Sequence, residues 1–330
     1  MRSPRHILIV KTSSLGDVLH ALPAVTDAAR ALPDLRCDWL VEQAFAEIPA
    51  WHPAVERVIR CDLRGWRRNL RQTVFGGDWS RFRAELRQTE YDLVLDAQGL
   101  VKSAWLARQA RGPVAGPDRS AAREPLAALF YTRGYAIPRH DQAHAVERTR
   151  RLFAQALGYP LPGAPPDAGL DRARFPVPDL AQPYAVLLHA TTWSSKRWPL
   201  PRWGELGAWL GGRGLRPVLP WGSEAERADA ETIAAACGGL VLPRLSLTEL
   251  GGWLAHARLC VGVDTGLAHL AAALGTPQVT LYGPTLPQLT GAVGASQVWL
   301  RSGEDRSIDR ERPTTVEVAR VQEALQGLVS

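Results

Sequence analysis

Short apolar runs alternate with amphipathic segments along the first half of the chain. The runs have the length of buried strands, and we predict strands at residues 6–11, 37–41, 57–60 and 91–96. Apolar positions spaced three and four residues apart predict helices at residues 17–32, 99–109 and 143–157. Strands that alternate with helices indicate βαβ units and a parallel sheet.

A proline-rich stretch ends this first pattern. Seven prolines lie between residues 160 and 183, and proline neither continues a helix nor donates a hydrogen bond to a strand. The pattern then restarts, with strands predicted at residues 184–188, 215–219, 259–263 and 277–281 and helices at residues 201–210, 224–236, 267–274 and 314–328.

The pattern predicts two α/β domains joined by a hinge. We expect an N-terminal domain of residues 1–160, a linker of residues 161–183 and a C-terminal domain of residues 184–330. We expect that the final helix of the C-terminal domain can pack back on the N-terminal domain. Ligands of open parallel sheets bind beyond the carboxyl ends of the strands, so two such domains facing each other would leave a cleft for two substrates.

The composition is that of an ordinary globular protein. Hydrophobic residues make up 46% and charged residues 22%, which excludes disordered and collagen-like classes. No apolar run approaches the ~18 residues needed to span a bilayer, and the run at residues 7–10 is too short for a signal peptide. We therefore expect a cytoplasmic protein. Its four cysteines lack metal-ligand spacing, and we expect them to be small buried apolar side chains.

The positive charge is concentrated in one segment. The net charge is +6, and residues 57–87 hold nine arginines against three acidic residues. Four of these arginines follow the spacing of one helix face: Arg64, Arg67, Arg68 and Arg71. Such a row is most simply a solvated face. Because no acid partner shares the row, however, it also indicates a site for an anionic ligand such as a phosphorylated sugar or a lipid head group.

Polar loops follow two predicted strands of the first half. In residues 11–17, small polar residues and Gly16 form a strand-to-helix turn that ends in Asp17. Asp17 either caps the helix or faces the cleft as a proton acceptor. In residues 96–103, Asp96 and Gln98 either fix their own loop or bind substrate hydroxyls, and Lys102 lies one turn into the helix, where it can reach an anion.

Phosphate-type motifs follow two strands of the second half. Thr191 and Thr192 precede Lys196, and hydroxyl donors with a compact positive charge suit a phosphate. The run from Asp264 to Gly266 opens a helix whose N-terminus favours a pyrophosphate. The remaining candidates of this half are His269 in the same helix, Glu224 as a carboxylate for ribose hydroxyls, and His189, which we expect to be a packed strand-end residue.

These motifs, in this order and over nearly the whole chain, resemble the lipopolysaccharide heptosyltransferase I family within glycosyltransferase family nine. The resemblance rests on residues 11–17, 96–103, 143–148, 189–199, 264–269 and 277–285. It implies the GT-B fold, in which two Rossmann-like domains with parallel sheets face each other across a cleft. The first loop fits heptosyltransferase I better than heptosyltransferase II, as do Thr192 and Thr265.

The resemblance also implies a reaction. L-glycero-D-manno-heptose passes from ADP-heptose to a Kdo sugar of Kdo-lipid A, with inversion, at the cytoplasmic face of the inner membrane. Asp17 would be the catalytic base, and no metal or other cofactor is implied. The donor site would comprise Thr191, Thr192, Lys196, Glu224, Leu245, Asp264, Thr265, Gly266 and His269. The acceptor site would comprise Ser13, Ser14, Gly16, Arg64, Arg67, Arg68, Gln98, Lys102 and Arg123.

Several other functions compete with this interpretation. One is a heptosyltransferase II-like enzyme with an already heptosylated acceptor, and another is a non-catalytic nucleotide-binding module. The pI near 9.4 suggests nucleic acid, but Trp66 lies on a different helix face from the arginine row, so no aromatic residue interleaves the row as a stacking platform. A dehydrogenase would carry a glycine fingerprint that this chain lacks.

The lysines give a separate indication of the site. Of the 39 Lys and Arg residues, only Lys11, Lys102 and Lys196 are lysines. Lys11 borders the loop of Asp17, Lys102 follows the turn at residues 96–99, and Lys196 lies in the phosphate-type segment of the second half. Where a genome favours arginine, a remaining lysine marks a place that prefers a compact charge to a planar fork. We therefore predict that replacement of lysine by arginine is tolerated least at Lys196.

Overall fold

The computed structural model describes residues 5–69, 76–303, 311 and 313–329 of the chain. The chain forms two compact units, Met1–Leu170 and Asp171–Ser330. Both are α/β units, and each is described by itself below. Within the described residues, no helix is both long enough and apolar enough to cross a membrane.

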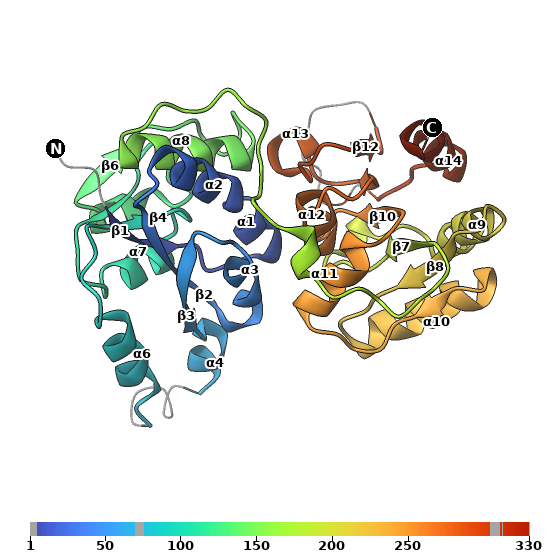
Figure 1. Ribbon diagram of the computed structural model, residues 1–330, viewed down its shortest axis with the longest axis horizontal. Helices are drawn as coiled ribbons and strands as arrows, with labels where there is room; N and C mark the ends of the chain where they lie inside the picture. The colour runs from blue at the N-terminus through green and yellow to red at the C-terminus, as the bar shows by residue number, and fades with distance from the viewer. Residues whose placement is uncertain (1–4, 70–75, 304–310, 312, 330) are drawn as a thin grey trace. The chain divides into compact units, whose positions relative to one another are not determined.

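The first unit is built on a six-stranded sheet in which every neighbouring pair is parallel (Figure 1). Its strands are β1 (His6–Val10), β2 (Arg36–Glu42), β3 (Val55–Cys61), β4 (Leu93–Asp96), β5 (Val114–Pro117) and β6 (Arg133–Tyr135). They are ordered β3-β2-β1-β4-β5-β6, which is the order of a Rossmann fold. The chain therefore reverses its direction across the sheet between β1 and β4.

Helices connect these strands, and all of them except α4 have buried residues. They are α1 (Leu15–Leu19), α2 (Leu22–Ala31), α3 (Glu47–Ala50), α4 (Leu63–Arg68), α6 (Asp78–Leu86), α7 (Val101–Ala107) and α8 (Ala145–Leu157), with 3-10 turns at Gln43–Phe45 and Pro125–Phe130. The single helix predicted at residues 17–32 is wrong, because α1 ends at Leu19 and α2 begins at Leu22. Pro23 explains the break, since its ring would clash with the carbonyl of Leu19 in a continuous helix.

A buried ion pair joins two helices of the first unit. Arg150 of α8 places Nε 2.6 Å from Oδ2 of Asp27 in α2, and both side chains are less than a tenth exposed. Arg150 Nη2 also donates to the carbonyls of Pro162 and Ala164. The beginning of the proline-rich stretch is therefore attached to the first unit. Its later part packs in the second unit, where Phe175 lies against Gly251 of α11 (Leu247–Ala255).

The second unit repeats the architecture of the first. Its strands are β7 (Tyr184–Leu188), β8 (Arg216–Leu219), β9 (Leu240–Val241), β10 (Leu259–Val263), β11 (Gln278–Tyr282) and β12 (Gln297–Arg301). All neighbouring pairs are parallel, in the order β12-β11-β10-β7-β8-β9. Counted from the first strand of the unit, this is the same Rossmann order, with its reversal between β7 and β10.

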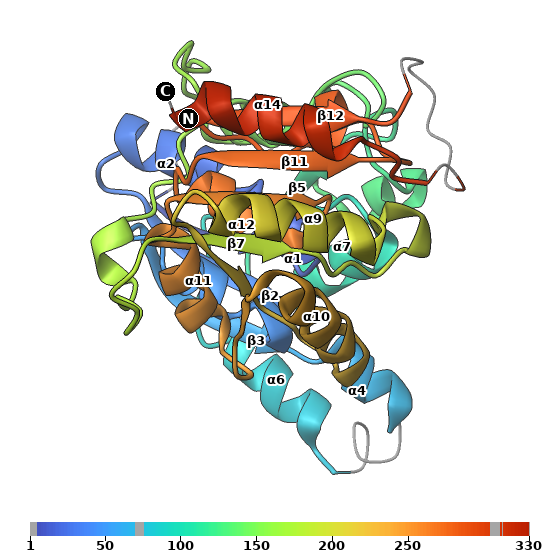
Figure 2. The same cartoon turned by 90° about the vertical axis from the view of Figure 1, so that its right-hand side faces the viewer.

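Helices cover both faces of the second sheet. They are α9 (Leu200–Gly211), α10 (Glu224–Cys237), α11, α12 (Gly266–Ala273), α13 (Pro287–Thr290) and α14 (Val318–Val329), with 3-10 turns at Arg172–Arg174 and Ser194–Lys196. Both α10 and α14 contact α9 (Figure 2). The buried residues Val321 and Leu325 of α14 belong to the core of the second unit. The final helix therefore buries its apolar face in its own unit.

Candidate functional site

The predicted motifs lie at the two places where a Rossmann sheet binds ligands. In the first unit, the loops after β1 and β4 leave neighbouring strands at the point of reversal. In the second unit, the loops after β7 and β10 do the same. Chains that leave neighbouring strands in opposite directions open a crevice at the carboxyl edge of the sheet.

Asp17 is part of the capping box of α1. The Ser14 backbone N–H and hydroxyl both donate to Asp17 Oδ2, at 3.0 and 2.9 Å. The capping role considered from the sequence is therefore present. Both hydrogen bonds use one carboxylate oxygen, and Asp17 is only partly buried. The cap fixes the carboxylate at the carboxyl edge of the sheet.

Charges around Asp17 keep it ionised. Burial raises the pKa of Asp17, but the Lys11 charge, the Ser14 hydrogen bonds and His20 together lower it to about 2. Lys11 donates from Nζ to the carbonyl of Ala97 at 3.3 Å. Burial lowers the pKa of Lys11, and the carboxylates of Asp17 and Asp96 partly offset this effect. The loop thus holds a lysine and a carboxylate that stabilise each other's charged forms.

Asp96 fixes the loop after β4. Its Oδ1 accepts the backbone N–H of Gln98 at 2.9 Å, and its Oδ2 accepts the hydroxyls of Ser103 and Tyr131 at 2.8 and 2.7 Å. Burial raises the pKa of this carboxyl. Gln98 Oε1 accepts both the backbone N–H and the hydroxyl of Thr12 at 2.8 Å, which ties the two loops together.

Backbone contacts hold Arg123 beside the same loop. The Glu124 N–H donates to the carbonyl of Gly99 at 3.0 Å, and Glu124 Oε2 accepts the N–H of Val101 at 2.7 Å. Gly99 has φ of +70°, and a Cβ there would lie 3.3 Å from the Arg123 nitrogen, so only glycine fits. Arg123 itself is exposed. It lowers the pKa of Lys11, so its charge acts on the Asp17 loop.

Arg148 of α8 is a further cation near Asp17 that the sequence motifs do not mark. Its Nε donates to the carbonyl of Pro138 at 2.8 Å, and its Nη2 donates to that of Ala121 at 3.3 Å. Burial and the neighbouring Arg123 lower the pKa of Arg148, while Asp141 and Asp17 raise it. Arg148 therefore adds a positive charge to the field around Asp17.

A second basic area lies at the ends of β2 and β3. Helix α4 carries Arg64, Arg67 and Arg68, whereas Arg71 lies outside the described residues. None of these three arginines forms an ion pair with a residue that the structure describes. Lys102 is exposed on α7. Both Arg64 and Lys102 lower the pKa of the buried Glu42, which burial and Asp62 raise.

Lys196 and Asp264 form the centre of the site in the second unit. Lys196 Nζ lies 2.6 Å from Asp264 Oδ2 and 4.8 Å from the centre of the Trp193 ring. Asp264 Oδ2 also accepts the hydroxyl of Thr285 at 2.7 Å. His269 Nε2 lies 3.5 Å from Asp264 Oδ1. Burial raises the pKa of Asp264, but His269 and Lys196 hold it well below its usual range.

The remaining residues predicted for the donor surround this pair. Thr191 is buried and donates to the carbonyl of Asp264 at 3.4 Å, while Thr192 is exposed. Thr265 is the N-cap residue of α12, and Gly266 is the first residue of that helix. The loops after β7 and β10 therefore bring hydroxyls, an ammonium group and a helix N-terminus to one edge, which suits a diphosphate.

Glu224 and Leu245 lie on the neighbouring β8 side of the sheet. Glu224 is exposed in the first turn of α10, with an oxygen 3.7 Å from Arg227. Its neighbour Glu226 serves the capping box, because its Oε2 accepts the N–H of Ser223 at 3.0 Å. Leu245 is partly buried just before α11.

His189, at the end of β7, is buried, and its Nε2 lies 3.0 Å from the carbonyl of Glu226. Both observations are consistent with the packed role expected for His189.

Among the described residues, one group of side chains that could hold a metal ion lies outside the loops considered above. His6, Asp38 and Glu56 bring one ligand atom each within 4.8 Å of the others. Asp38 already accepts the hydroxyl of Tyr91 at 2.7 Å, and Glu56 pairs with Arg36. These neighbours occupy the carboxylate oxygens, so we interpret the group as a hydrogen-bonded ion network of the first unit.

Comparison with known proteins identifies the family. Residues 79–319 match the model of glycosyltransferase family 9 (heptosyltransferase). The chain belongs to glycosyltransferase family 9. It is 57% identical over 298 residues to the lipopolysaccharide heptosyltransferase 1 of Pseudomonas aeruginosa, which covers 90% of this chain and 83% of that protein. It is 46% identical over 314 residues to the lipopolysaccharide heptosyltransferase 1 of Escherichia coli K12, covering 94% and 98%.

Solved structures of family 9 agree with this result. The E. coli heptosyltransferase WaaC with ADP has a TM-score of 0.90 at 44% identity, over 98% of this chain and 99% of that chain. The same enzyme with ADP-2-deoxy-2-fluoro heptose has a TM-score of 0.87. The predicted fold class, α/β with two Rossmann-like domains and parallel sheets, is confirmed.

The family 9 site also contains residues that the sequence reasoning missed. Thr314 donates from its hydroxyl to the carbonyls of Ser195 and Lys196, at 3.2 and 3.1 Å. Thr285 positions Asp264. Thr285 lay in a loop already noted after β11, but no local signal marks Thr314, because its partners are more than a hundred residues away in the chain.

Proposed function

We propose that this family 9 enzyme transfers L-glycero-D-manno-heptose from ADP-heptose to a lipid acceptor in lipopolysaccharide inner-core synthesis. The observation that carries the proposal is the likeness over both units to an enzyme solved with ADP and with an ADP-heptose analogue. The identities of 46 and 57% to proteins named lipopolysaccharide heptosyltransferase 1 support the same reaction.

The donor is bound by the second unit. Thr191, Thr192 and the N-terminus of α12 at Thr265 and Gly266 hold the diphosphate, and Lys196 neutralises it. Lys196 also offsets the negative charge that grows on the ADP leaving group, and stabilisation of developing charge is the contribution most useful for rate. Glu224 binds ribose hydroxyls, and Leu245 lines the adenine pocket. Asp264 and His269 position Lys196 and complete the site.

Asp17 is the catalytic base of an inverting displacement. The acceptor hydroxyl oxygen forms a bond to C1 of the heptose while the bond from C1 to the phosphate oxygen breaks, and ADP leaves with the electron pair. The hydroxyl proton passes to the Asp17 carboxylate. In an oxocarbenium-like transition state the attacking hydroxyl becomes acidic as the new bond forms, so a carboxylate with a low pKa can accept the proton.

The acceptor is a Kdo sugar of Kdo-lipid A, bound by the first unit. Ser13, Ser14 and Gly16 belong to the Asp17 loop at the carboxyl edge of the sheet, and Gln98 accepts hydrogen bonds from Thr12 of the same loop. Lys102 and Arg123 bind the anionic sugar, and the arginine row of α4 binds the phosphates of the lipid. The supporting observation is the lack of ion pairs between this row and described acids. The enzyme would then act in the cytoplasm, at the inner face of the inner membrane.

The decisive experiment is a mass-spectrometric transfer assay with two acceptors. ADP-heptose is supplied with Kdo-lipid A or with its already heptosylated product. We expect one heptose to be added to Kdo-lipid A and none to the product. Transfer only to the heptosylated acceptor would make the protein heptosyltransferase II-like. ADP binding without transfer to either acceptor would favour the non-catalytic nucleotide-binding module.

The arginine row has its own test. Arg64, Arg67, Arg68 and Arg71 are changed together to serine, and the KM for Kdo-lipid A is measured as a function of salt. We expect a higher KM and a weaker salt dependence, because salt screens the attraction that the arginines supply. An unchanged KM with unchanged salt dependence would remove the row from the acceptor site.

A further inference from the structure

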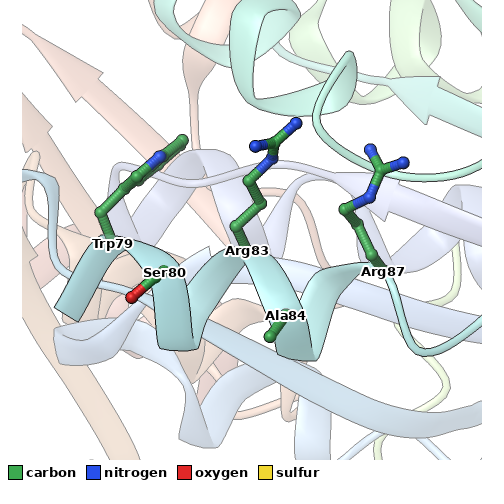
Figure 3. A pocket seen from close by; sticks show the side chains of 5 residues that line it. All are labelled: Trp79, Ser80, Arg83, Ala84 and Arg87. Atoms are coloured by element: carbon green, nitrogen blue, oxygen red, sulfur yellow. The ribbon is translucent and has the colours of Figure 1, made fainter. Parts of the chain in front are cut away.

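Helix α6 carries a row of side chains that the transfer reaction leaves unused. Trp79, Arg83 and Arg87 are spaced four residues apart and point to the same side of the helix (Figure 3). Together with Ser80 and Ala84 they line a hollow of about 340 Å³ (Figure 3). Residues four apart lie one above the other on a helix, so the row extends along the helix axis.

A neighbouring row of side chains on α6 anchors the helix on the core. Phe82 and Leu86 are buried in the hydrophobic core of the first unit. This buried row holds the helix on the core, and Arg83 and Arg87 lie beside it at the solvent edge. The two arginines are exposed because of how the helix is packed.

An aromatic stack forms one end of the row. The Trp79 ring lies on the ring of Trp105 in α7, with centroids 4.9 Å apart and planes inclined by only 17°. Trp79 also contacts Trp66 and Phe82, which connect the stack to the core. Trp105 itself is 42% exposed. A large indole held open to solvent beside cationic groups is typical of a surface that meets the head-group region of a membrane.

The arginines of the row have no acidic partner within the described residues. Arg87 donates to the carbonyl of Gln109 at 3.2 Å, which leaves its charge uncompensated. The ion pair on this helix is between Arg81 and Asp78, on another side of it. Two guanidinium groups without an acidic partner on one face can each donate hydrogen bonds to a phosphate.

We infer that Trp79, Arg83, Arg87 and Trp105, the Trp-Arg face, bind the head-group layer of an anionic phospholipid bilayer. This inference rests on the proposed function, because an acceptor embedded in a membrane requires the enzyme to reach that membrane. Charge complementarity favours the bilayer, since phosphodiester groups match the free guanidinium groups and the indoles match the interface. Nucleic acid is disfavoured because Trp79 and Trp105 stack on each other and so cover the ring faces that bases would use.

The test measures vesicle binding in the absence of donor and acceptor. Full-length protein is sedimented with vesicles of phosphatidylcholine alone or with added phosphatidylglycerol. Arg83→Ser with Arg87→Ser forms one variant and Trp105→Ser another. The matched control is Arg30→Ser with Arg36→Ser, which removes the same charge from two exposed arginines of the same unit.

We expect the double arginine variant to bind anionic vesicles roughly 30-fold more weakly, because each basic residue near a charged membrane contributes about a factor of five. Trp105→Ser should weaken binding several-fold on both kinds of vesicle, whereas the control should retain most of its affinity. Folding of each variant is checked by its thermal transition.

Three results would overturn the inference. The first is unchanged vesicle binding by both variants. The second is an equal loss in the control, which would mean that net charge alone governs binding. The third is unchanged vesicle binding with a raised KM for Kdo-lipid A dispersed in detergent, which would make the face part of the acceptor site. Wild-type protein that binds vesicles but never transfers heptose would refute the proposed function, and the inference that the Trp-Arg face binds membranes would still stand.

Discussion

Lys196 Nζ lies 2.6 Å from Asp264 Oδ2, and both side chains are largely buried. The ammonium group also lies over the ring of Trp193, and Thr285 holds the same carboxylate oxygen from the other loop. Three neighbours from three loops, Trp193, Asp264 and Thr285, thus define the position of one compact positive charge. A planar guanidinium has a different shape and different donor directions, so this position distinguishes lysine from arginine.

Lys196→Arg is therefore expected to lower kcat/KM for ADP-heptose by about 10- to 100-fold, which corresponds to about 1.4–2.7 kcal/mol. The longer, planar group cannot keep both the contact with Asp264 and the distance to a diphosphate. The measurement is steady-state kinetics together with the Kd for ADP. Lys102→Arg is the control, because Lys102 is exposed and its replacement should change kcat/KM less than threefold. Equal effects at the two positions would refute the prediction.

Asp17→Asn should abolish transfer while leaving donor binding intact. The amide oxygen can still accept the Ser14 hydrogen bonds that form the cap, but it cannot take a proton. Removal of a general base costs roughly 10²- to 10⁴-fold in rate, so we expect kcat to fall by at least about a hundredfold. The Kd for ADP should be unchanged, because the donor residues belong to the second unit. Asp34→Asn, at an exposed position, serves as the control. Transfer at near-normal rates would exclude Asp17 as the base.

The regular part of the fold could be predicted from the sequence. The central strands of both units are nearly continuous apolar runs, because they are buried on both faces. The strands that were missed are β5, β6, β9 and β12, which are short, lie toward the sheet edges or contain glycine and proline. Their position is determined by pairing with a neighbour, and that information is not local.

The site could be predicted to the level of loops but not of partners. Strand-end motifs marked the loops after β1, β4, β7 and β10, and the shared Rossmann order explains why these loops lie in pairs. Sequence spacing offered both roles for Asp96, but it could not show that Tyr131 also binds the Asp96 carboxylate, or that Arg148 of α8 acts on Asp17. These two contacts join segments that are far apart in the chain.

Lys11→Met should make activity sensitive to acid. In the wild type the pKa of Asp17 is lowered from 3.8 to about 2. Its contribution to stability is therefore present above pH 3.8 and is lost as the pH falls toward 2. Without Lys11 the largest effect that lowers the pKa of Asp17 is lost, so this pKa rises above its wild-type value.

The measurement is the pH profile of kcat/KM. The acid limb of Lys11→Met should appear at a higher pH than that of the wild type, and the stability that Asp17 contributes at acid pH should shrink. Lys11→Arg keeps the charge and should retain most of the wild-type profile. Superimposable profiles for Lys11→Met and wild type would show that Lys11 does not control the Asp17 carboxylate.

The buried pair of Asp27 and Arg150 should be important for stability. Asp27→Ala leaves the Arg150 charge buried without its partner, and breaking such a pair costs about 3–5 kcal/mol. Glu147→Ala breaks the exposed pair with Arg151 on the same helix and should cost less than about 1 kcal/mol. Urea unfolding measures both values. Similar losses in the two variants would contradict the distinction between buried and exposed pairs.

Thr314→Val tests whether the last segment of the chain supports the donor loop. The hydroxyl of Thr314 is buried and donates to the carbonyls of Ser195 and Lys196, and valine keeps its shape without the donor. Loss of a buried hydrogen bond costs about 1 kcal/mol, so ADP should bind roughly fivefold more weakly. Thr232→Val is the matched control, because that hydroxyl donates within α10. If isothermal titration gives the same Kd for both variants, the Thr314 hydroxyl does not contribute to the position of the Lys196 loop, and the link that remains is the backbone N–H of residue 314, which donates to the Ser195 carbonyl at 3.1 Å.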